Sequence, residues 1–241
     1  MSEYQEDSRA RDGSGSTFDW ILGALILLFT TGVFASVAWD AYLANDKDKT
    51  GVRRIIAKRW NDRTLVFPIE GTDRQGRRAV FDVVVLTKNY GWVRGSTTEL
   101  AKDDRRLSAD EIQDEVLAPQ LRQGLGSALG LIAVGLASQE GDVAREEQRG
   151  AERSVRTARW VQSALGDRIP MWTLNLGRYV DPCADCEDTD TSWQRPFIVI
   201  AVRQADEGAH ISEALADAMS GTTNLPAPSR YSAFAFAKFK R

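Results

Sequence analysis

The pattern of hydrophobic and polar positions divides the chain into one long apolar run near the N-terminus and a longer region of short elements. The run, WILGALILLFTTGVFASVAW, covers residues 20–39 and contains no charged side chain. A helix of about 20 residues spans roughly 30 Å, the thickness of a membrane's hydrocarbon core. Trp20 and Trp39 stand at its ends, where aromatic rings favour the headgroup level. The pattern therefore predicts one transmembrane helix over 18–43, with a buried core helix and a cleaved signal peptide as alternatives.

The segments on either side of this run are polar and differ in charge. Residues 1–17 are predicted to be a disordered tail, and residues 44–63 a juxtamembrane linker. Within the linker, GVRRIIAKRW at 51–60 indicates a short basic helix, either on the membrane surface or in solvent. Because Lys and Arg are more numerous in the linker than in the tail, the positive-inside rule favours a cytoplasmic C-terminal domain.

Residues 64–241 are predicted to form one soluble α+β domain, because runs with strand character alternate with amphipathic stretches. The domain is expected to open with a β-hairpin, whose strands at 64–69 and 79–87 flank a turn at 73–76. The further elements are strands at 128–137, 171–176, 196–202 and 231–239, and helices at 143–165 and 211–219.

Local signals define another helix in this region. Ser108 and Glu111 have the spacing of a capping box. A helix is therefore expected to run from there through Leu117 towards Leu121, with a kink at Pro119.

The helix expected at 143–165 combines an apolar stripe with a charged surface, and Gly166 is expected to end it. The stripe consists of Ala144, Ala151, Val155, Ala158, Val161 and Leu165. The rest of its surface is dense in charge, with Arg145, Glu146, Glu147, Arg149, Glu152, Arg153 and Arg156.

Composition argues against several classes of function. A formal net charge of −3 provides no electrostatic basis for binding nucleic acid, which requires an excess of Lys and Arg on some face. Two Cys and one His cannot supply a four-ligand Cys/His zinc site unless carboxylates contribute. No nucleophile elbow, phosphate loop or HExxH helix is present, and His210 is interpreted as a surface or helix-start residue. The sequence therefore predicts no enzyme activity, no metal and no cofactor.

Cys183 and Cys186 lie in the acidic stretch DPCADCEDTD. Neighbouring carboxylates disfavour the thiolate that a redox CxxC motif needs. A local disulfide is expected if this loop faces an oxidising compartment. A metal site that also uses nearby carboxylates, a catalytic pair and two idle thiols are the alternatives.

One region combines a strand, a loop between Gly135 and Gly141, and a helix that carries Arg153 and an aromatic–aliphatic pair at 160–161. In this order and spacing, residues 108–202 resemble the OmpA-like domain, which also ends the flagellar stator protein MotB and the peptidoglycan-associated lipoproteins. The two glycines match those of the family, and Arg153 matches the arginine that grips the peptide carboxylate of peptidoglycan. The resemblance implies an OmpA-like α/β sandwich, here preceded by the β-hairpin.

The chain departs from the family pattern at the ligand site. Ser138 stands where the family has the aspartate that pairs with the ammonium group of diaminopimelate, and Glu146 stands where it has an asparagine. A charged hydrogen bond is worth about 1.5–3 kcal/mol, so losing the aspartate should weaken binding roughly tenfold to a hundredfold. The resemblance thus implies a ligand site at Arg153 and Ser138 that binds peptidoglycan weakly or not at all. A solvated helix charge is the alternative interpretation of Arg153.

The order of the predicted elements is also similar to stator B-subunits of the MotB type and to the related Zorya defence stators. These have a short tail, one membrane helix with an Asp near its entry, and a distal OmpA-like domain. In them the Asp carries protons through a channel built with a multi-span partner. Asp19 is the matching residue here, and a carboxylate within a membrane is a functional hypothesis. A solvated position at the membrane interface is the alternative for Asp19.

These observations lead us to expect a single-pass membrane-anchored binding or scaffolding protein of the bacterial cell envelope. Its expected partners are membrane lipid and other envelope or membrane proteins, in a homo- or hetero-oligomer and without nucleic acid. The resemblance implies the bacterial inner membrane with the OmpA-like domain in the periplasm, against the charge bias of the linker. A MotB- or Zorya-like stator subunit of a proton-driven complex is the alternative function.

Overall fold

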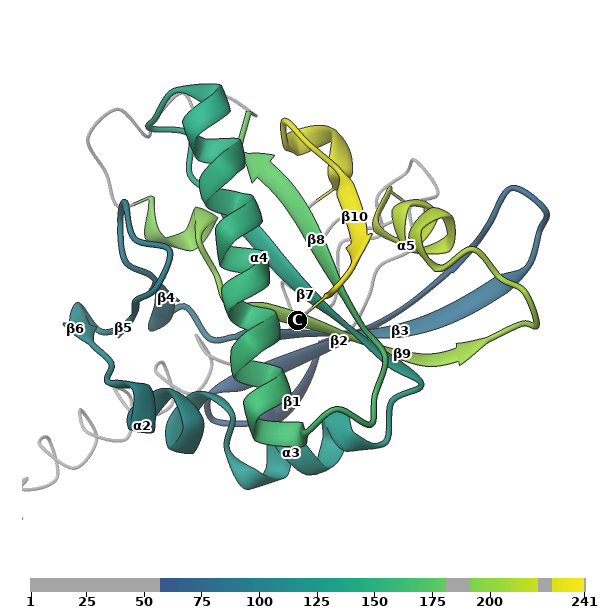
Figure 1. The fold of residues 1–241 in the computed structure, drawn as a ribbon, viewed down its shortest axis with the longest axis horizontal. Helices are drawn as coiled ribbons and strands as arrows, with labels where there is room; N and C mark the ends of the chain where they lie inside the picture. Colours follow the sequence, from purple (N-terminus) through teal and green to yellow (C-terminus); the bar gives the residue numbers. More distant parts are fainter. Residues whose placement is uncertain (1–56, 181–190, 221–226, 241) are drawn as a thin grey trace, which may run out of the picture. The chain divides into compact units, whose positions relative to one another are not determined.

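A computed structural model of the chain describes residues 57–180, 191–220 and 227–240. This part of the chain combines a seven-stranded mixed sheet, a small three-stranded sheet and four α-helices (Figure 1). The prediction of the α+β class is confirmed. No helix within the described ranges is long and apolar enough to cross a membrane. The helix expected at 18–43 and the tail expected at 1–17 lie outside these ranges.

The large sheet has the strand order β1-β2-β3-β9-β7-β8-β10. Among these strands β7 and β8 pair in parallel, and the other neighbours are antiparallel. The strands are β1 (Lys58–Asn61), β2 (Thr64–Thr72), β3 (Arg78–Leu86), β7 (Gly130–Ala137), β8 (Met171–Arg178), β9 (Ile198–Ala205) and β10 (Ala235–Lys238). The parallel pair results from the helical crossover α4 (Val143–Leu165), whereas β2 and β3 form the expected antiparallel hairpin.

The first strand corrects a prediction about the linker. Residues 51–60 were expected to form a short helix, but Lys58 pairs with Val66 and Arg59 pairs with Leu65 in an antiparallel ladder. Pairing with the edge of the hairpin outweighs the local helical pattern, because strand formation depends on the neighbours a segment meets. The folded domain therefore begins within the residues assigned to the linker.

The capping box is confirmed at the start of α2 (Ala109–Glu111). The amide of Ser108 donates to the Glu111 carboxylate at 2.8 Å, and the amide of Glu111 donates to Ser108 Oγ at 3.2 Å. The expected continuous helix is wrong beyond this turn. A π-helix, η1 (Ile112–Val116), follows, and a separate helix, α3 (Pro119–Gly126), begins at the proline.

Pro119 starts a helix because its missing amide hydrogen would be unpaired at a first helical position in any case. The break leaves carbonyl groups that the helix itself does not satisfy. The guanidinium of Arg122 donates to the carbonyl oxygens of Gln113 and Leu117 and thus ties α3 to η1.

The three-stranded sheet was not predicted. It consists of β4 (Tyr90–Trp92), β5 (Leu100–Lys102) and β6 (Arg105–Arg106) in that order. Lys102 Nζ lies 2.9 Å from Glu115 Oε2, and the Tyr90 hydroxyl donates to the same oxygen at 3.2 Å. These contacts hold the small sheet to η1.

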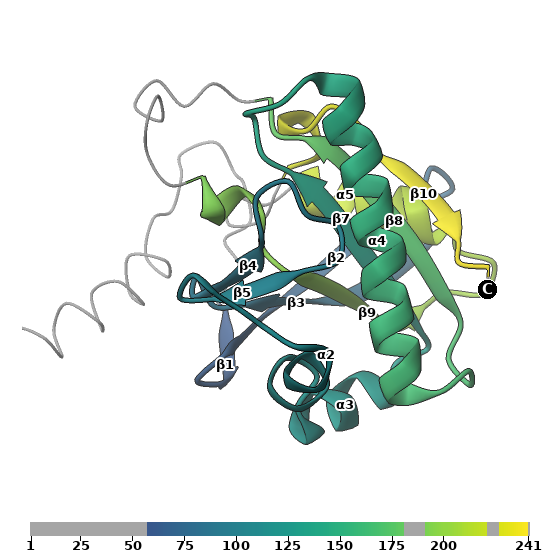
Figure 2. The same cartoon turned by 60° about the vertical axis from the view of Figure 1, so that its left-hand side comes forward.

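Helices cover both faces of the large sheet (Figure 2). On one face α4 packs against β7 and β8, beside η1, α3 and the small sheet. On the other face α5 (Ile211–Ser220) packs against β2 and β3. Every residue of β7 is buried, which explains its continuous apolar sequence: Leu131 and Ala133 face the α4 side, and Ile132 and Val134 face the opposite side.

The remaining elements agree with most of the sequence-based expectations. Helix α4 has the predicted bounds, with Asp142 as its N-cap and Gly166 as its C-cap. The strands expected near 171–176 and 231–239 correspond to β8 and β10. Two short 3-10 helices, η2 (Ser192–Gln194) and η3 (Pro228–Arg230), complete the described part.

Candidate functional site

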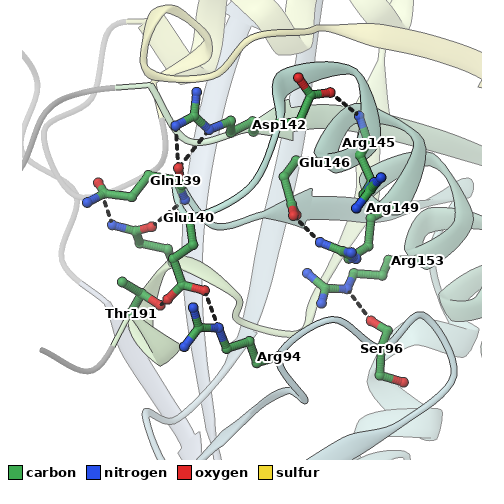
Figure 3. Close-up of polar contacts among 12 residues, drawn as sticks. Arg94, Ser96, Gln139, Glu140, Asp142, Arg145, Glu146, Arg149, Arg153 and Thr191 are labelled. Atoms are coloured by element: carbon green, nitrogen blue, oxygen red, sulfur yellow. Dashed lines mark hydrogen bonds and ion pairs between the residues drawn. The ribbon is translucent and has the colours of Figure 1, made fainter. Parts of the chain in front are cut away.

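A polar hollow lies where β7 ends and α4 begins, beside the loop that follows β4. Its volume is about 190 Å³. Arg94, Gly95, Ser138, Glu140, Gly141, Glu146, Arg149 and Arg153 line it. The structure thus brings together the two predicted ligand-binding residues, Ser138 and Arg153. Three arginines and two glutamates meet here, so the candidate site is rich in charge (Figure 3).

Helix α4 approaches β7 very closely at Gly135, beside the hollow. A Cβ atom at Gly135 would collide with the carbonyl oxygen of Gly150 and the amide nitrogen of Ser154. Glycine at the end of β7 therefore allows strand and helix to touch backbone to backbone. Ser138, which is 4% exposed, lines the hollow together with side chains from the first half of α4.

Arg153 is fully buried, so the interpretation as a solvated helix charge is wrong. Its guanidinium donates three hydrogen bonds to backbone carbonyl oxygens: Nε to Ser96 at 2.9 Å, Nη1 to Leu136 at 2.8 Å and Nη2 to Val93 at 3.2 Å. The guanidinium also lies over the Trp92 ring, 5.4 Å from its centroid. Arg153 therefore joins α4, β7 and the loop after β4.

The charge of Arg153 is held in an unfavourable environment. Burial lowers its pKa to about 9, and the nearby charges of Arg195 and Arg149 act in the same direction, while Glu146 opposes them. At neutral pH the side chain is still charged. Carbonyl dipoles and the aromatic ring stabilise it in place of water.

Glu146 is a second buried charge on α4 and is 4% exposed. Its carboxylate pairs with the guanidinium of Arg149 one turn further along the helix (Figure 3). A Cβ atom at Gly141 would collide with this carboxylate, so the glycine makes the space in which the Glu146 side chain lies. The hollow therefore contains a carboxylate of the protein itself beside its arginines.

The outer wall of the hollow is a second ion pair. Arg94 Nε lies 2.7 Å from Glu140 Oε2, and the Thr191 hydroxyl donates to Glu140 Oε1 (Figure 3). The loop is held by reciprocal contacts: the Gln139 amide donates to Gln194 Oε1 at 3.0 Å, and Gln194 Nε2 donates to Gln139 Oε1 at 3.2 Å. The charged groups of the hollow thus already have partners within the protein.

The aromatic–aliphatic pair expected at 160–161 lies on α4 between Arg153 and the C-terminal end of the helix. Val161 is buried, and Trp160 stacks on Trp92 with ring centroids 5.3 Å apart and an interplanar angle of 15°. Trp92 therefore contacts both Trp160 and Arg153. This stack couples the small sheet to the helix that carries the candidate site.

The charge pattern of α4 differs from the prediction. Glu146 and Arg153 are buried, whereas Ala144 of the expected apolar stripe is exposed. Arg153 donates to the Leu136 carbonyl oxygen of β7, and Glu146 lines the hollow, so polar side chains of the first half of α4 face inward. The spacing of Glu146 and Arg149, three residues apart on a helix, was a signal of their pairing that the sequence offers.

Sequence reasoning missed the residues that reach the hollow from outside the β7–α4 unit. Arg94 and Ser96 come from the loop after β4, and Thr191 comes from the segment before β9. No local pattern marks them, because their role depends on loops that meet in space.

The remaining predicted site residues belong to parts of the chain that the structure does not describe. Asp19, Cys183 and Cys186 lie outside the described ranges. Within those ranges no group of three or more His, Cys, Asp or Glu is placed to hold a metal ion. No protein-family model, curated protein or solved structure matches this chain.

Proposed function

We propose that this chain is a single-pass membrane-anchored binding or scaffolding protein of the bacterial cell envelope. The apolar run at 20–39 supports the anchor. The order of β7, a two-glycine loop and a helix carrying Arg153 supports a degenerate OmpA-like domain. On this proposal the domain lies in the periplasm, and its partners are other envelope or membrane proteins.

The main observation behind the proposed loss of standard peptidoglycan binding is that the Glu146 carboxylate lies in the hollow and pairs with Arg149. A ligand carboxylate needs a guanidinium with free donors. Arg153 directs its donors to backbone carbonyl oxygens, and Arg149 pairs with Glu146. Ser138 offers no negative charge to a ligand ammonium group. The charged groups that line the hollow are therefore paired with other groups of the protein, and few donors or acceptors remain for a zwitterionic peptide.

The test is a pull-down of the full-length, detergent-solubilised chain with purified sacculi. We expect no saturable retention, in contrast to an OmpA-like protein that keeps both the aspartate and the arginine. Saturable retention that is lost in Arg149→Gln would overturn the proposal. Arg149 is preferred for this variant because its side chain is 19% exposed and its removal disturbs the core less than removal of Arg153.

A second candidate is a stator-like subunit of a proton-driven complex. The observation that favours it is Asp19, which opens the apolar run in front of a domain of the proposed kind. Here the membrane helix acts as part of a proton path, and the soluble domain positions the complex. The two candidates differ in whether the carboxylate of Asp19 is required.

A further inference from the structure

Helix α4 carries a row of charged side chains on the face that it turns away from the large sheet. Figures 1 and 2 show this helix lying across one face of the sheet. The row consists of Arg145, Arg149, Glu152, Arg156 and Arg159, none of which is buried. Steps of alternately four and three residues keep these positions on one side of a helix. Four arginines and one glutamate give the row a net charge of +3, whereas the whole chain has a net charge of −3.

Most of this positive charge has no counter-charge in the described part of the protein. Within the row only Arg149 forms an ion pair, and its partner is Glu146. The guanidinium groups without an ion pair to a described residue are those of Arg145, Arg156 and Arg159. Elsewhere in the same ranges, ion pairs form at Arg74, Arg77, Arg78, Arg94, Arg105, Arg106, Arg122 and Arg203. Three uncompensated arginines on one face of one helix are therefore not the rule in this domain.

The arrangement does not serve the stability of α4. Arg145 and Arg149 are four residues apart, and like charges at this spacing destabilise a helix. The same holds for Arg156 and Arg159, which are three residues apart. Arg145 also lies in the first turn, where the helix dipole disfavours a cation. Since proteins break such local rules mainly at functional positions, the row is expected to serve a contact outside the helix.

A second hollow, beside the C-terminal part of the row, offers space for an apolar group. Its volume is about 380 Å³, within the range of roughly 300–1,000 Å³ typical of ligand pockets. Its lining consists of Thr97, Ala151, Glu152, Val155, Arg156 and Arg159. The partly exposed side chains of Ala151 and Val155 supply apolar surface next to the guanidinium groups.

The charge pattern and the surrounding surface favour a protein segment over other anionic partners. Nucleic acid carries a phosphate at every step of its backbone, so phosphates would meet the carboxylate of Glu152 in the middle of the row. A helix that binds a membrane surface also buries large apolar side chains in it. The exposed large hydrophobic residues of the described ranges are Leu129, Val143, Val180 and Trp193, and none belongs to the row. The same row of a second copy would be repelled by like charge.

We infer that the outward face of α4 binds an acidic helical segment of a partner protein. A helix lying along α4 has the same rise of about 1.5 Å per residue, so charges at the same spacing can meet every member of the row. The segment has carboxylates opposite the four arginines and a Lys or Arg opposite Glu152, and an apolar side chain enters the second hollow. Each exposed ion pair contributes little by itself, so binding depends on several pairs at once. This inference rests on the proposed binding role of the domain and names the kind of partner.

The test uses the full-length chain in a non-ionic detergent and a fluorescent, alanine-rich helical peptide. The peptide has the spacing of the row, with Glu at the four outer positions, Lys at the central position and a Leu beside that Lys. We expect saturable binding, measured by fluorescence anisotropy. Binding should weaken at least about fivefold between about 50 mM and about 500 mM NaCl, because salt screens exposed charges. A peptide with the opposite charges should bind at least about tenfold more weakly.

Matched variants test whether the charges of the row pair with the peptide. Arg156→Glu should weaken binding at least about tenfold. Arg168→Glu makes the same change of charge at an exposed position beyond the end of α4 and should alter binding less than about twofold.

A charge exchange at the centre of the row separates specific pairing from damage to the fold. Glu152→Lys should weaken binding of the peptide with a central Lys and strengthen binding of a peptide with a central Glu. A variant that had merely lost its fold would lose affinity for both peptides. Circular dichroism of each variant shows whether the domain is still folded.

Three results would overturn the inference. The first is a lack of binding to the folded chain. The second is equal weakening by Arg156→Glu and Arg168→Glu, because net charge alone would then govern binding. The third is displacement of the peptide by a DNA oligonucleotide or by short-chain phosphatidylglycerol at lower concentration than by unlabelled peptide, because the face would then serve nucleic acid or lipid. Sedimentation of the chain with membranes is measured separately, so failure of peptide binding is distinguishable from failure of the proposed membrane anchoring.

Discussion

Arg153 Nη1 donates a hydrogen bond of 2.8 Å to the carbonyl oxygen of Leu136, so a charged residue of α4 binds the backbone of the strand before it. The same guanidinium reaches the loop after β4 through Ser96 and Val93. Because these hydrogen bonds all go to the protein backbone, the buried charge of Arg153 stabilises the fold of the domain. On the proposed OmpA-like resemblance, this bonding also explains why this arginine has few donors left for a ligand.

Arg153→Met should destabilise the domain strongly, because it keeps most of the side-chain volume but removes the guanidinium donors from the carbonyl oxygens of Ser96 and Leu136. The third acceptor, the Val93 carbonyl oxygen, keeps its hydrogen bond from the Ser96 amide. Each unsatisfied buried acceptor costs about 1–3 kcal/mol, so we expect a loss of about 3–5 kcal/mol in the free energy of unfolding. Urea denaturation measures this loss in the free energy of unfolding. The matched control is Arg159→Met on the exposed side of the same helix, with an expected change within about 0.5 kcal/mol. Equal denaturation midpoints for both variants would contradict the structural role.

Glu146→Ala should convert the hollow into an anion site. Removing one partner of a buried ion pair costs about 3 kcal/mol, because Arg149 loses its counter-charge and Arg153 loses a nearby one. Added acetate or formate should then raise the melting temperature of this variant with increasing concentration, since a ligand that binds only the folded state stabilises it. The wild type and the exposed-site control Glu152→Ala should show no such rise. An equal response of all three proteins would refute the prediction.

Gly135→Ala should separate α4 from β7, because the added methyl group collides with backbone atoms of Gly150 and Ser154. Backbone atoms cannot move aside as a flexible side chain can, so we expect a loss of about 2–4 kcal/mol. Gly126→Ala near the end of α3 is the control, because a Cβ there meets no atom within 4 Å. Thermal unfolding compares the two. A neutral Gly135→Ala would show that the close contact is not required.

Acid should destabilise the domain through two carboxyl groups. Hydrogen bonds from Ser108 and Arg105 lower the pKa of Glu111 from 4.5 to about 2. At Asp73 burial raises the pKa, but hydrogen bonds from His210, Arg77 and Gln75 outweigh it and hold the pKa well below its usual range.

Both groups bind a proton less readily in the folded than in the unfolded chain. Their stabilisation is therefore complete above about pH 5 and is lost as the pH falls towards about 2. Urea midpoints at about pH 6 and about pH 3 should differ less in Glu111→Gln and Asp73→Asn than in the wild type. The same pH dependence in all three proteins would disprove the assignment.

Asp19→Asn should distinguish the two proposed functions. In a stator-like subunit, loss of the ionisable group abolishes proton-driven activity while the chain still assembles with its partners. In a membrane-anchored scaffold, the variant keeps full function. The measurement is complementation by the variant at wild-type levels in membranes, with Asp40→Asn at the other end of the apolar run as the control.

Much of the fold is predictable from local sequence because the elements carry strong periodic or capping signals. The bounds of α4 follow from its periodicity and Gly166, and the hairpin follows from β-branched runs around a turn. The capping box at Ser108 and Glu111 is likewise a local signal. Predictions fail where a neighbour decides the outcome: Lys58 and Arg59 become strand because β2 offers an edge.

The candidate site shows the same division. The resemblance to the OmpA-like domain implied that Ser138 and Arg153 belong to one site, and the structure places both around one hollow. Sequence could not indicate that Arg153 is buried, because burial depends on Val93 and Ser96 from a distant loop. Nor could it reveal Arg94 and Glu140 as a pair.

The sequence by itself determined the apolar run, the alternation of elements and the places where helices and strands begin, since these depend on residues close together in the chain. Only the tertiary structure decided which charges face solvent and which are enclosed. That outcome depends on how closely two backbones approach, as at Gly135, and on which carbonyl groups then lie within reach of a guanidinium. Neither property can be predicted from the residues that are adjacent in the sequence.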